Sequence, residues 1–315
     1  MDRTTDQQNI ECTERRGFLK CMLWAGTGVI WTISGGVPRS GLIGSAQAAM
    51  PASGGFTFMQ ISDSHIGFSH PPNTDVTGTL REAVERVNQL KGNSSLLIHT
   101  GDVSHLSRAG QFDTAEQIIR GTGLDTHFVP GEHDVLDQDG KTFFERFTKG
   151  ADKGYYSFDQ HGVHFVGLNN VQNLKAGGLG NLGQEQLEWL EKDLRPRPSS
   201  QPIILFAHVP LWLVYKQWGW GTADGAQALS YLRRFASVTV LNGHIHQVMQ
   251  KVEGHVAFHT ALSTAFPQPA PGTAPSPGPM KNVPPGKLKT LLGVTSVRQV
   301  RGKSHLAIVD TPLEA

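Results

Sequence analysis

The sequence contains very little cysteine, and this scarcity limits the chemistry of the folded chain. Only two of its 315 residues are cysteine, and both, Cys12 and Cys21, lie close to the N-terminus. No residue after position 21 can form a disulfide or supply a thiolate. A zinc finger and a thiol nucleophile are therefore excluded for the rest of the chain.

An excess of charge of one sign is also missing. The chain has 28 lysines and arginines against 27 aspartates and glutamates, so its net charge of +1 gives no reason to expect nucleic-acid binding. With 38% hydrophobic and 17% charged residues, the composition is that of a soluble globular chain. A disordered chain and a multi-span membrane protein are both excluded. The 14 histidines are the first indication of metal chemistry.

The first 48 residues have the three parts of an export signal and resemble a twin-arginine signal peptide. The pair Arg15–Arg16 is followed by Phe-Leu-Lys at 18–20, then by an uncharged run over 21–38. Ser-Ala-Gln-Ala at 45–48 places small residues at the −3 and −1 positions of a peptidase site.

This pattern predicts cleavage after Ala48 and export by the twin-arginine machinery. The mature protein is then expected in the periplasm or secreted, without stable insertion in a membrane. The alternative is an uncleaved N-terminal anchor. The glycines and Pro38 of the run make it a poor spanning helix, because about 20 apolar residues are needed to cross a bilayer.

Residues 49–315 read as one α/β domain in which a strand, a polar motif and a helix follow one another five times. Residues 266–285 hold eight prolines in twenty, which predicts an ordered loop or spacer without regular structure. Strands are expected at 56–61, 96–98, 126–129, 155–158, 163–168, 203–206 and 238–241, then to about 260, and again within 291–310. Helices are expected around 80–90, 110–120, 187–194 and 225–235.

Aspartate and histidine side chains follow the ends of these strands. Ligands in open α/β sheets bind at the carboxyl ends of strands, so these side chains are expected to meet. Each fragment is weak alone, but their order along the chain is specific. The fragments are Asp63-x-His65, Gly101-Asp102, Gly131-Glu132-His133-Asp134, His208 and Gly243-His244-Ile-His246.

This series of motifs, from Asp63 to His246, resembles the calcineurin-like metallophosphoesterase superfamily. The resemblance is greatest to its cyclic-nucleotide-phosphodiesterase-like and purple-acid-phosphatase-like branches. It implies a four-layer αββα sandwich of two mixed β-sheets flanked by helices. His65 and His105 depart from the purple acid phosphatase pattern, which has no histidine at the first position and a tyrosine at the second. We therefore expect no purple tyrosinate-to-iron colour.

The resemblance also implies a role for each position. Asp63, His65 and His246 would hold a first metal ion. His208 and His244 would hold a second, and Asp102 would bridge both. The ligand set suits Fe, Mn or Zn. Two ions can share a hydroxide that attacks a phosphomonoester or phosphodiester.

The same resemblance gives His133 and Asp134 catalytic roles. His133 would protonate the leaving oxygen or stabilise the charge that develops on it, and Asp134 would orient the ring of His133. We expect His105, one turn after Asp102, to support the ligands.

Glu132 is the main departure, because the family usually has asparagine there. Asp63, Asp102, Glu132 and a hydroxide together carry four negative charges, which would neutralise two divalent ions. We therefore predict that Glu132 binds the second metal and that the pair is mixed-valent, Fe³⁺ with a divalent ion. The alternatives are that Glu132 turns away or that activity is simply lower.

Other readings stay open. The fold could serve as a metal-binding or protein-interaction module with weak or no catalysis, and Glu132 is the feature that favours this. A secreted esterase or protease is disfavoured because neither G-x-S-x-G nor H-E-x-x-H occurs.

The tryptophan-rich stretch 209–220 either stacks on a ligand or forms a packed hydrophobic plug. Structural or surface roles are expected for His70, His99, His127, His161, His164, His255, His259 and His305.

Overall fold

The computed structural model describes residues 28–34, 37–43, 56–299 and 306–314. The chain divides into two units, residues 1–50 and 51–315. In the first unit, β1 (Gly28–Ser34) and β2 (Val37–Ile43) form a two-stranded antiparallel sheet. The twin-arginine pair and the expected cleavage position at Ala48 lie outside the described residues. Among the residues that are described, no helix is long and apolar enough to span a bilayer.

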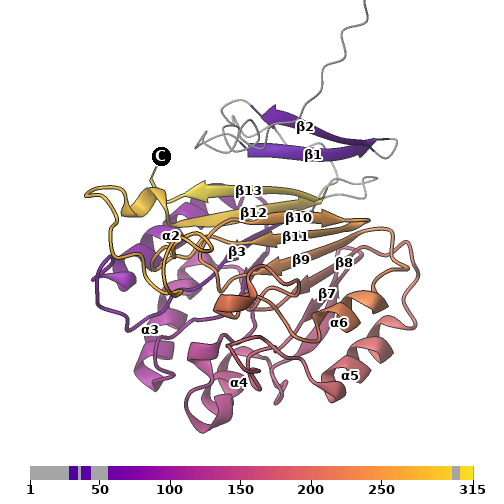
Figure 1. Cartoon of the computed structure of the whole chain (residues 1–315), viewed down its shortest axis with the longest axis horizontal. Helices are drawn as coiled ribbons and strands as arrows, with labels where there is room; N and C mark the ends of the chain where they lie inside the picture. The colour runs from indigo at the N-terminus through magenta and orange to yellow at the C-terminus, as the bar shows by residue number, and fades with distance from the viewer. Residues whose placement is uncertain (1–27, 35–36, 44–55, 300–305, 315) are drawn as a thin grey trace, which may run out of the picture. The chain divides into compact units, whose positions relative to one another are not determined.

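Two mixed sheets make up the second unit. The five-stranded sheet has the order β13-β12-β3-β4-β5, with β3, β4 and β5 parallel and β12 and β13 added antiparallel. The six-stranded sheet has the order β10-β11-β9-β8-β7-β6, and its four central strands are parallel. Figure 1 shows these strands as stacked arrows in the middle of the unit. The strands are β3 (Phe56–Ile61), β4 (Leu96–His99), β5 (Asp125–Phe128), β6 (Tyr156–Gln160), β7 (Val163–Gly167), β8 (Ile203–Phe206), β9 (Val238–Asn242), β10 (Gln250–Glu253), β11 (Val256–Thr260), β12 (Gly293–Gln299) and β13 (Leu306–Pro312).

The alternation of side chains along each strand produces the layers. On β3, Phe58 faces the space between the sheets, where it packs with residues of β7 and β8. The next residue, Met59, points to the opposite face and packs on helices. On β8 the same alternation sends Ile204 to the space between the sheets and Leu205 to the other helical layer. Each fully buried side chain of this size contributes about 1.5–3 kcal/mol.

Helices cover the two outer faces. Helices α2 (Val76–Leu90), α3 (Ala109–Ile119) and α4 (Lys141–Phe147) pack on the five-stranded sheet. Helices α5 (Gln184–Leu194) and α6 (Gly225–Tyr231) pack on the six-stranded sheet. Figure 1 shows α2 and α3 on the left and α5 and α6 on the right. The four-layer αββα sandwich predicted from the motifs is therefore confirmed.

The sequence pattern missed one helix. Helix α4 has only seven residues, and its buried phenylalanines Phe143, Phe144 and Phe147 give too short a periodic pattern to stand out. The segment 266–285 contains no helix or strand, as its prolines predict.

Candidate metal centre

Every predicted ligand follows the carboxyl end of a parallel strand. Strands β3, β4, β8 and β9 lead directly into ligand loops, and β5 leads into a 3₁₀ turn over Glu132–Asp134. Because β3, β4 and β5 are parallel to one another, as are β8 and β9, these ends gather at one edge of the sandwich. The structure brings together all seven predicted ligands, which are Asp63, His65, Asp102, Glu132, His208, His244 and His246.

The ligand loops have an uncommon backbone conformation. Asp63, His65 and Asp102 have φ values of 54°, 41° and 55°, and His244 and His246 have values of 70° and 53°. Non-glycine residues rarely adopt this left-handed region, and where they do the surrounding structure must enforce it. Paired loop backbones supply that constraint, since His65 N–H donates to the carbonyl of Asp102 at 2.8 Å.

Two glycines of the motifs leave space for carboxylates. A Cβ atom at Gly131 would lie 2.1 Å from Oδ1 of Asp102. A Cβ atom at Gly243 would lie 2.7 Å from Oδ2 of Asp63 and closer still to the hydroxyl of Ser62. Both glycines are therefore required by close packing around the ligands rather than by a turn.

The first group of ligand atoms is fully enclosed. Nε2 of His246 lies 3.2 Å from Oδ1 of Asp63 and 3.3 Å from Nε2 of His65. All three residues are at most 2% exposed. Burial raises the pKa of Asp63, but the neighbouring His246 and His208 lower it by more, so that it falls to about 2. This carboxylate is therefore charged at every physiological pH.

The second group faces a cavity. Glu132 holds its Oε1 3.0 Å from Nδ1 of His244 and its Oε2 2.9 Å from Nε2 of His208. The carboxylate thus lies among the ligands and does not turn away. Glu132 Oε2, His208 Nε2 and His244 Nδ1 are buried and have no hydrogen bond of acceptable geometry. These three atoms converge and lack hydrogen-bond partners, so they are suited to bind one metal cation through their lone pairs.

Asp102 stands between the two groups. Its Oδ2 lies 3.3 Å from Nε2 of His65 and 3.3 Å from Nε2 of His208, so one carboxylate atom reaches both. Its Oδ1 accepts a hydrogen bond from the backbone N–H of His133 at 2.9 Å. This geometry fits the bridging role that the resemblance implies for Asp102.

Backbone carbonyls fix the tautomers of two ligand histidines. Nδ1 of His208 donates to the carbonyl of Thr100 at 2.7 Å, and Nδ1 of His246 donates to that of Phe266 at 2.6 Å. With the proton held at Nδ1, each Nε2 presents its lone pair to the cluster. Such supporting contacts are typical of histidines that bind metals.

The charged side chains of the second group shift one another's pKa values. Burial lowers the pKa of His208, but the carboxylates of Asp102 and Glu132 raise it by more, to well above its ordinary value. Burial raises the pKa of Glu132, yet His244 and His208 bring it well below its ordinary value. The side chains of Glu132 and His208 thus stabilise each other's charged forms.

His133 lies beside the cluster at the cavity wall. Burial lowers its pKa, but Asp102 and Glu132 raise it by more, so the pKa of His133 lies above the ordinary histidine value.

The structure corrects the predicted orienting role of Asp134. Nδ1 of His133 donates to the carbonyl of His105 at 2.8 Å, while the carboxylate of Asp134 accepts from the backbone N–H groups of Val103 and Ser104. Asp134 therefore fixes the backbone of the loop after Asp102, and the carbonyl of His105 orients the ring of His133.

A cavity of about 440 Å³ opens in front of the two groups. Beyond the proposed ligands, His105, His133 and Gln268, the walls are aromatic, aliphatic, glycine and proline residues, and no lysine or arginine lines the cavity in the described part of the chain. Within the tryptophan-rich stretch, Trp218 and Trp220 are packed, because they are 9% and 1% exposed and their rings meet edge to face at 5.0 Å. Both nevertheless form part of the wall.

Sequence reasoning missed two supporting residues. His99, expected to be structural, is fully buried and joins two ligand loops, since its Nδ1 accepts from Gly101 N–H and its Nε2 contacts Ser64 Oγ at 2.8 Å. Gln268, in the proline-rich segment, donates to the carbonyl of His244 at 2.8 Å. Neither residue belongs to a recognisable motif, and only the fold brings them to the site.

Comparison with known proteins identifies the family. The calcineurin-like phosphoesterase family matches residues 56–248, and the chain belongs to it. Its members include metal-dependent phosphoric ester hydrolases, and this chain is one. The superfamily predicted from the motifs is therefore confirmed.

Two curated relatives and one solved structure are similar to the chain. A probable glycerophosphodiester phosphodiesterase GpdQ from Arcobacter nitrofigilis is 24% identical over 213 residues, covering 65% of this chain and 77% of the relative. A 3',5'-cyclic-nucleotide phosphodiesterase from Nostoc sp. is 24% identical over 212 residues, covering 66% and 77%. A dimetal phosphatase from Danio rerio shares the fold with a TM-score of 0.56 at 16% identity, covering 81% of this chain and 98% of that one.

Proposed function

We propose that the protein is a dinuclear metal-dependent phosphodiesterase. The observation that carries this is the division of the seven ligand residues into two groups joined by Asp102. Asp63, His65 and His246 would hold one ion, and Glu132, His208 and His244 the other. When bound, two such ions supply an activated water and polarise the phosphoryl oxygens. The names of the two curated relatives, both phosphodiesterases, support the same ester class.

His133 is the residue that we assign to the leaving group. Its Nδ1 is fixed by the carbonyl of His105, which leaves Nε2 free toward the cavity. A protonated Nε2 would donate its proton to the departing ester oxygen. Histidine suits this role because its ordinary pKa lies near neutral pH.

The cavity favours a phosphodiester over a phosphomonoester. A monoester carries two negative charges near neutral pH, and the described walls offer no lysine or arginine to match the second. For any given pair of ions, Glu132 makes the site one unit more negative than asparagine would, which reduces the attraction for a dianion. A diester carries one charge, and its two arms fit walls that contain Phe68, Phe266 and Trp218.

The test is hydrolysis by the full chain after metal removal and reloading with Mn²⁺, Fe²⁺ or Zn²⁺. Bis(para-nitrophenyl) phosphate is compared with para-nitrophenyl phosphate, and His133→Ala with a His70→Ala control, since His70 lies outside the cavity wall. We expect metal-dependent turnover that favours the diester, a loss of about 10²–10⁴-fold in His133→Ala, and none in the control. A folded protein that binds two ions and hydrolyses neither ester would contradict the proposal and favour a binding module instead.

The metal pair is proposed to be mixed-valent, Fe³⁺ with a divalent ion, because Glu132 supplies a negative charge at the second group. Electron paramagnetic resonance of the protein as isolated should then give the signal of a coupled Fe³⁺–divalent pair. Two plain divalent ions in fully active protein would overturn this part of the proposal and leave the diesterase assignment untouched.

We also propose that the protein is exported by the twin-arginine pathway. The support is the Arg15–Arg16 pair and the small residues at 45–48. Replacing both arginines with lysine should remove the protein from the periplasmic fraction of a bacterial host, and N-terminal sequencing of the exported wild type should begin at Ala49. Export that is unaffected by the double replacement would refute the pathway.

A further inference from the structure

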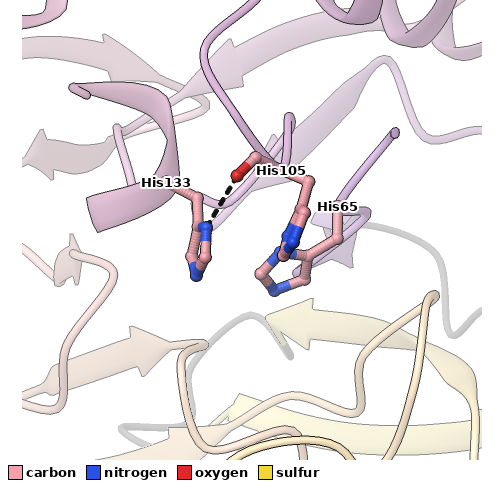
Figure 2. Close-up of side chains that lie close together, drawn as sticks. All are labelled: His65, His105 and His133. Atoms are coloured by element: carbon pink, nitrogen blue, oxygen red, sulfur yellow. Dashed lines mark hydrogen bonds between the residues drawn. The ribbon is translucent and has the colours of Figure 1, made fainter. Parts of the chain in front are cut away.

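The loops that carry His65 and His105 run side by side. His105 N–H donates to the carbonyl of Ile66 at 3.0 Å, Ile66 N–H donates to that of Val103 at 3.0 Å, and Ile66 and Ser104 form a short parallel bridge. This pairing places the two imidazole rings 5.5 Å apart. Figure 2 shows His65 and His105 next to each other, with His133 facing both rings.

The side chain of His105 faces the outer nitrogen of a proposed ligand. Its Nδ1 lies 3.4 Å from Nδ1 of His65, while Nε2 of His65 points into the cluster, 3.3 Å from Oδ2 of Asp102. To bind a cation through Nε2, His65 must carry its proton on Nδ1, and that proton needs an acceptor. His208 and His246 use backbone carbonyls for this purpose, whereas His65 depends on a side chain.

His105 also supports His133, in two ways. Its carbonyl accepts the hydrogen bond from Nδ1 of His133 at 2.8 Å, drawn as the dashed line in Figure 2. Its ring stacks on that of His133, with centroids 4.8 Å apart and an interplanar angle of 17°. One residue thus contacts a proposed metal ligand and the proposed proton donor.

We infer that His105 is a positioning residue that sets the tautomer of His65 for metal binding and the orientation of His133 for the leaving group. The inference rests on the proposed function. It also assigns the His65–His105–His133 cluster a supporting role in place of a third metal site. Nδ1 of His133 is already engaged by a carbonyl, and Nε2 of His65 already faces the first group of ligands.

Two substitutions separate the contributions of the ring. His105→Phe keeps a flat ring for stacking but removes the acceptor for His65. His105→Asn places an amide oxygen close to the position of Nδ1 but removes the stack. Neither changes the backbone carbonyl. His70→Phe is the matched control, because His70 lies on the same loop as His65 and contacts Phe68 but no proposed ligand.

The experiment measures metal binding and turnover of the full chain. Mn²⁺ is titrated into metal-free protein by calorimetry, and hydrolysis of bis(para-nitrophenyl) phosphate is followed separately. We expect His105→Phe to bind one of the two ions, the one at His65, about 10–100-fold more weakly, the usual effect of removing a ligand's supporting contact. His105→Asn should restore the affinity but lower kcat, most of all for diesters with poor leaving groups, because His133 has lost its stacking partner.

The outcomes distinguish this inference from the proposed function. Wild-type protein that binds two ions and hydrolyses no ester contradicts the function. Active wild type with unchanged Mn²⁺ affinity in His105→Phe overturns the positioning role. Binding of three ions by the wild type, reduced to two in both His105 variants, also overturns it and makes His105 a ligand.

Discussion

Two fully buried histidines outside the candidate metal cluster differ from those within it. In the cluster, His65 and His246 lie 3.3 Å apart, His208 lies 3.3 Å from Asp102, and His246 lies 3.2 Å from Asp63. Outside it, His259 pairs with Asp310 at 2.9 Å, and His164 with Asp193 at 2.7 Å.

This difference shows that burial of a histidine does not identify a functional site. His164, His208 and His259 are all fully buried. Remote pairs such as His259–Asp310 tie elements together, in this case β11 of one sheet and β13 of the other. In the cluster, carboxylates and imidazoles converge from five loops and leave donor atoms unsatisfied. A metal cation can be bound by several of these atoms at once, whereas a single proton cannot.

Asp102→Asn should have the largest effect, because one oxygen of Asp102 serves both groups. We expect loss of at least one ion and a fall in diesterase activity of about 10³-fold or more, consistent with several kcal/mol of lost charge stabilisation. Metal analysis and steady-state kinetics measure both. The matched control is Asp310→Asn, which changes the same group in a remote pair and should retain the metal. Full metal content in Asp102→Asn would mean that this carboxylate, like Asp310, is not needed to hold metal.

Glu132→Asn tests the charge of the second group. Replacing the carboxylate with the amide usual in the family makes the site more positive by one unit. The ratio of monoester to diester hydrolysis should rise roughly tenfold, which corresponds to about 1.4 kcal/mol. The two para-nitrophenyl substrates give this ratio directly. An unchanged ratio would mean that Glu132 does not influence substrate charge.

His259→Asn tests the histidine–aspartate pairs outside the cluster. Removing the imidazole leaves Asp310 with only the hydroxyl of Thr295 as a side-chain partner. We expect a loss of about 1–3 kcal/mol in unfolding free energy and no change in metal content. Thermal unfolding and metal analysis provide the two measurements. Metal loss without loss of stability would show that this pair belongs functionally to the cluster.

His127, which lies outside the cluster, gives stability a dependence on pH. Burial, together with Lys149, lowers its pKa to about 4, from an ordinary 6.5. The unfolded chain therefore binds the extra proton first, and stability falls as pH decreases from about 6.5 to about 4, by at most about 1.4 kcal/mol per unit. Urea unfolding across this range should show a steeper decline for the wild type than for His127→Gln. Equal slopes would contradict the assignment.

The sequence predicts the fold and the gathering of the ligands well, because both depend on local order along the chain. Strand ends such as Ile61 and His99 lead directly into motifs, and parallel pairing then brings Asp63 and Asp102 to one edge. The supporting contacts could not be predicted in this way. The acceptor for His133 Nδ1 is a backbone carbonyl 28 residues away, and any residue type supplies one.

The wrong orienting role for Asp134 has the same origin. A carboxylate next to a catalytic histidine suggests a direct contact, but a tight 3₁₀ turn directs the two side chains to different partners. Gln268 illustrates the opposite case, in which a residue without a motif reaches His244 because the proline-rich segment returns to the site.

The most direct test of the two-group centre is a crystal structure of the protein loaded with Mn²⁺, with anomalous diffraction recorded at the manganese edge. The account predicts two peaks: one among Asp63, His65 and His246, the other among Glu132, His208 and His244, with Asp102 in contact with both. A single peak, or a second ion that does not contact Glu132, would contradict it.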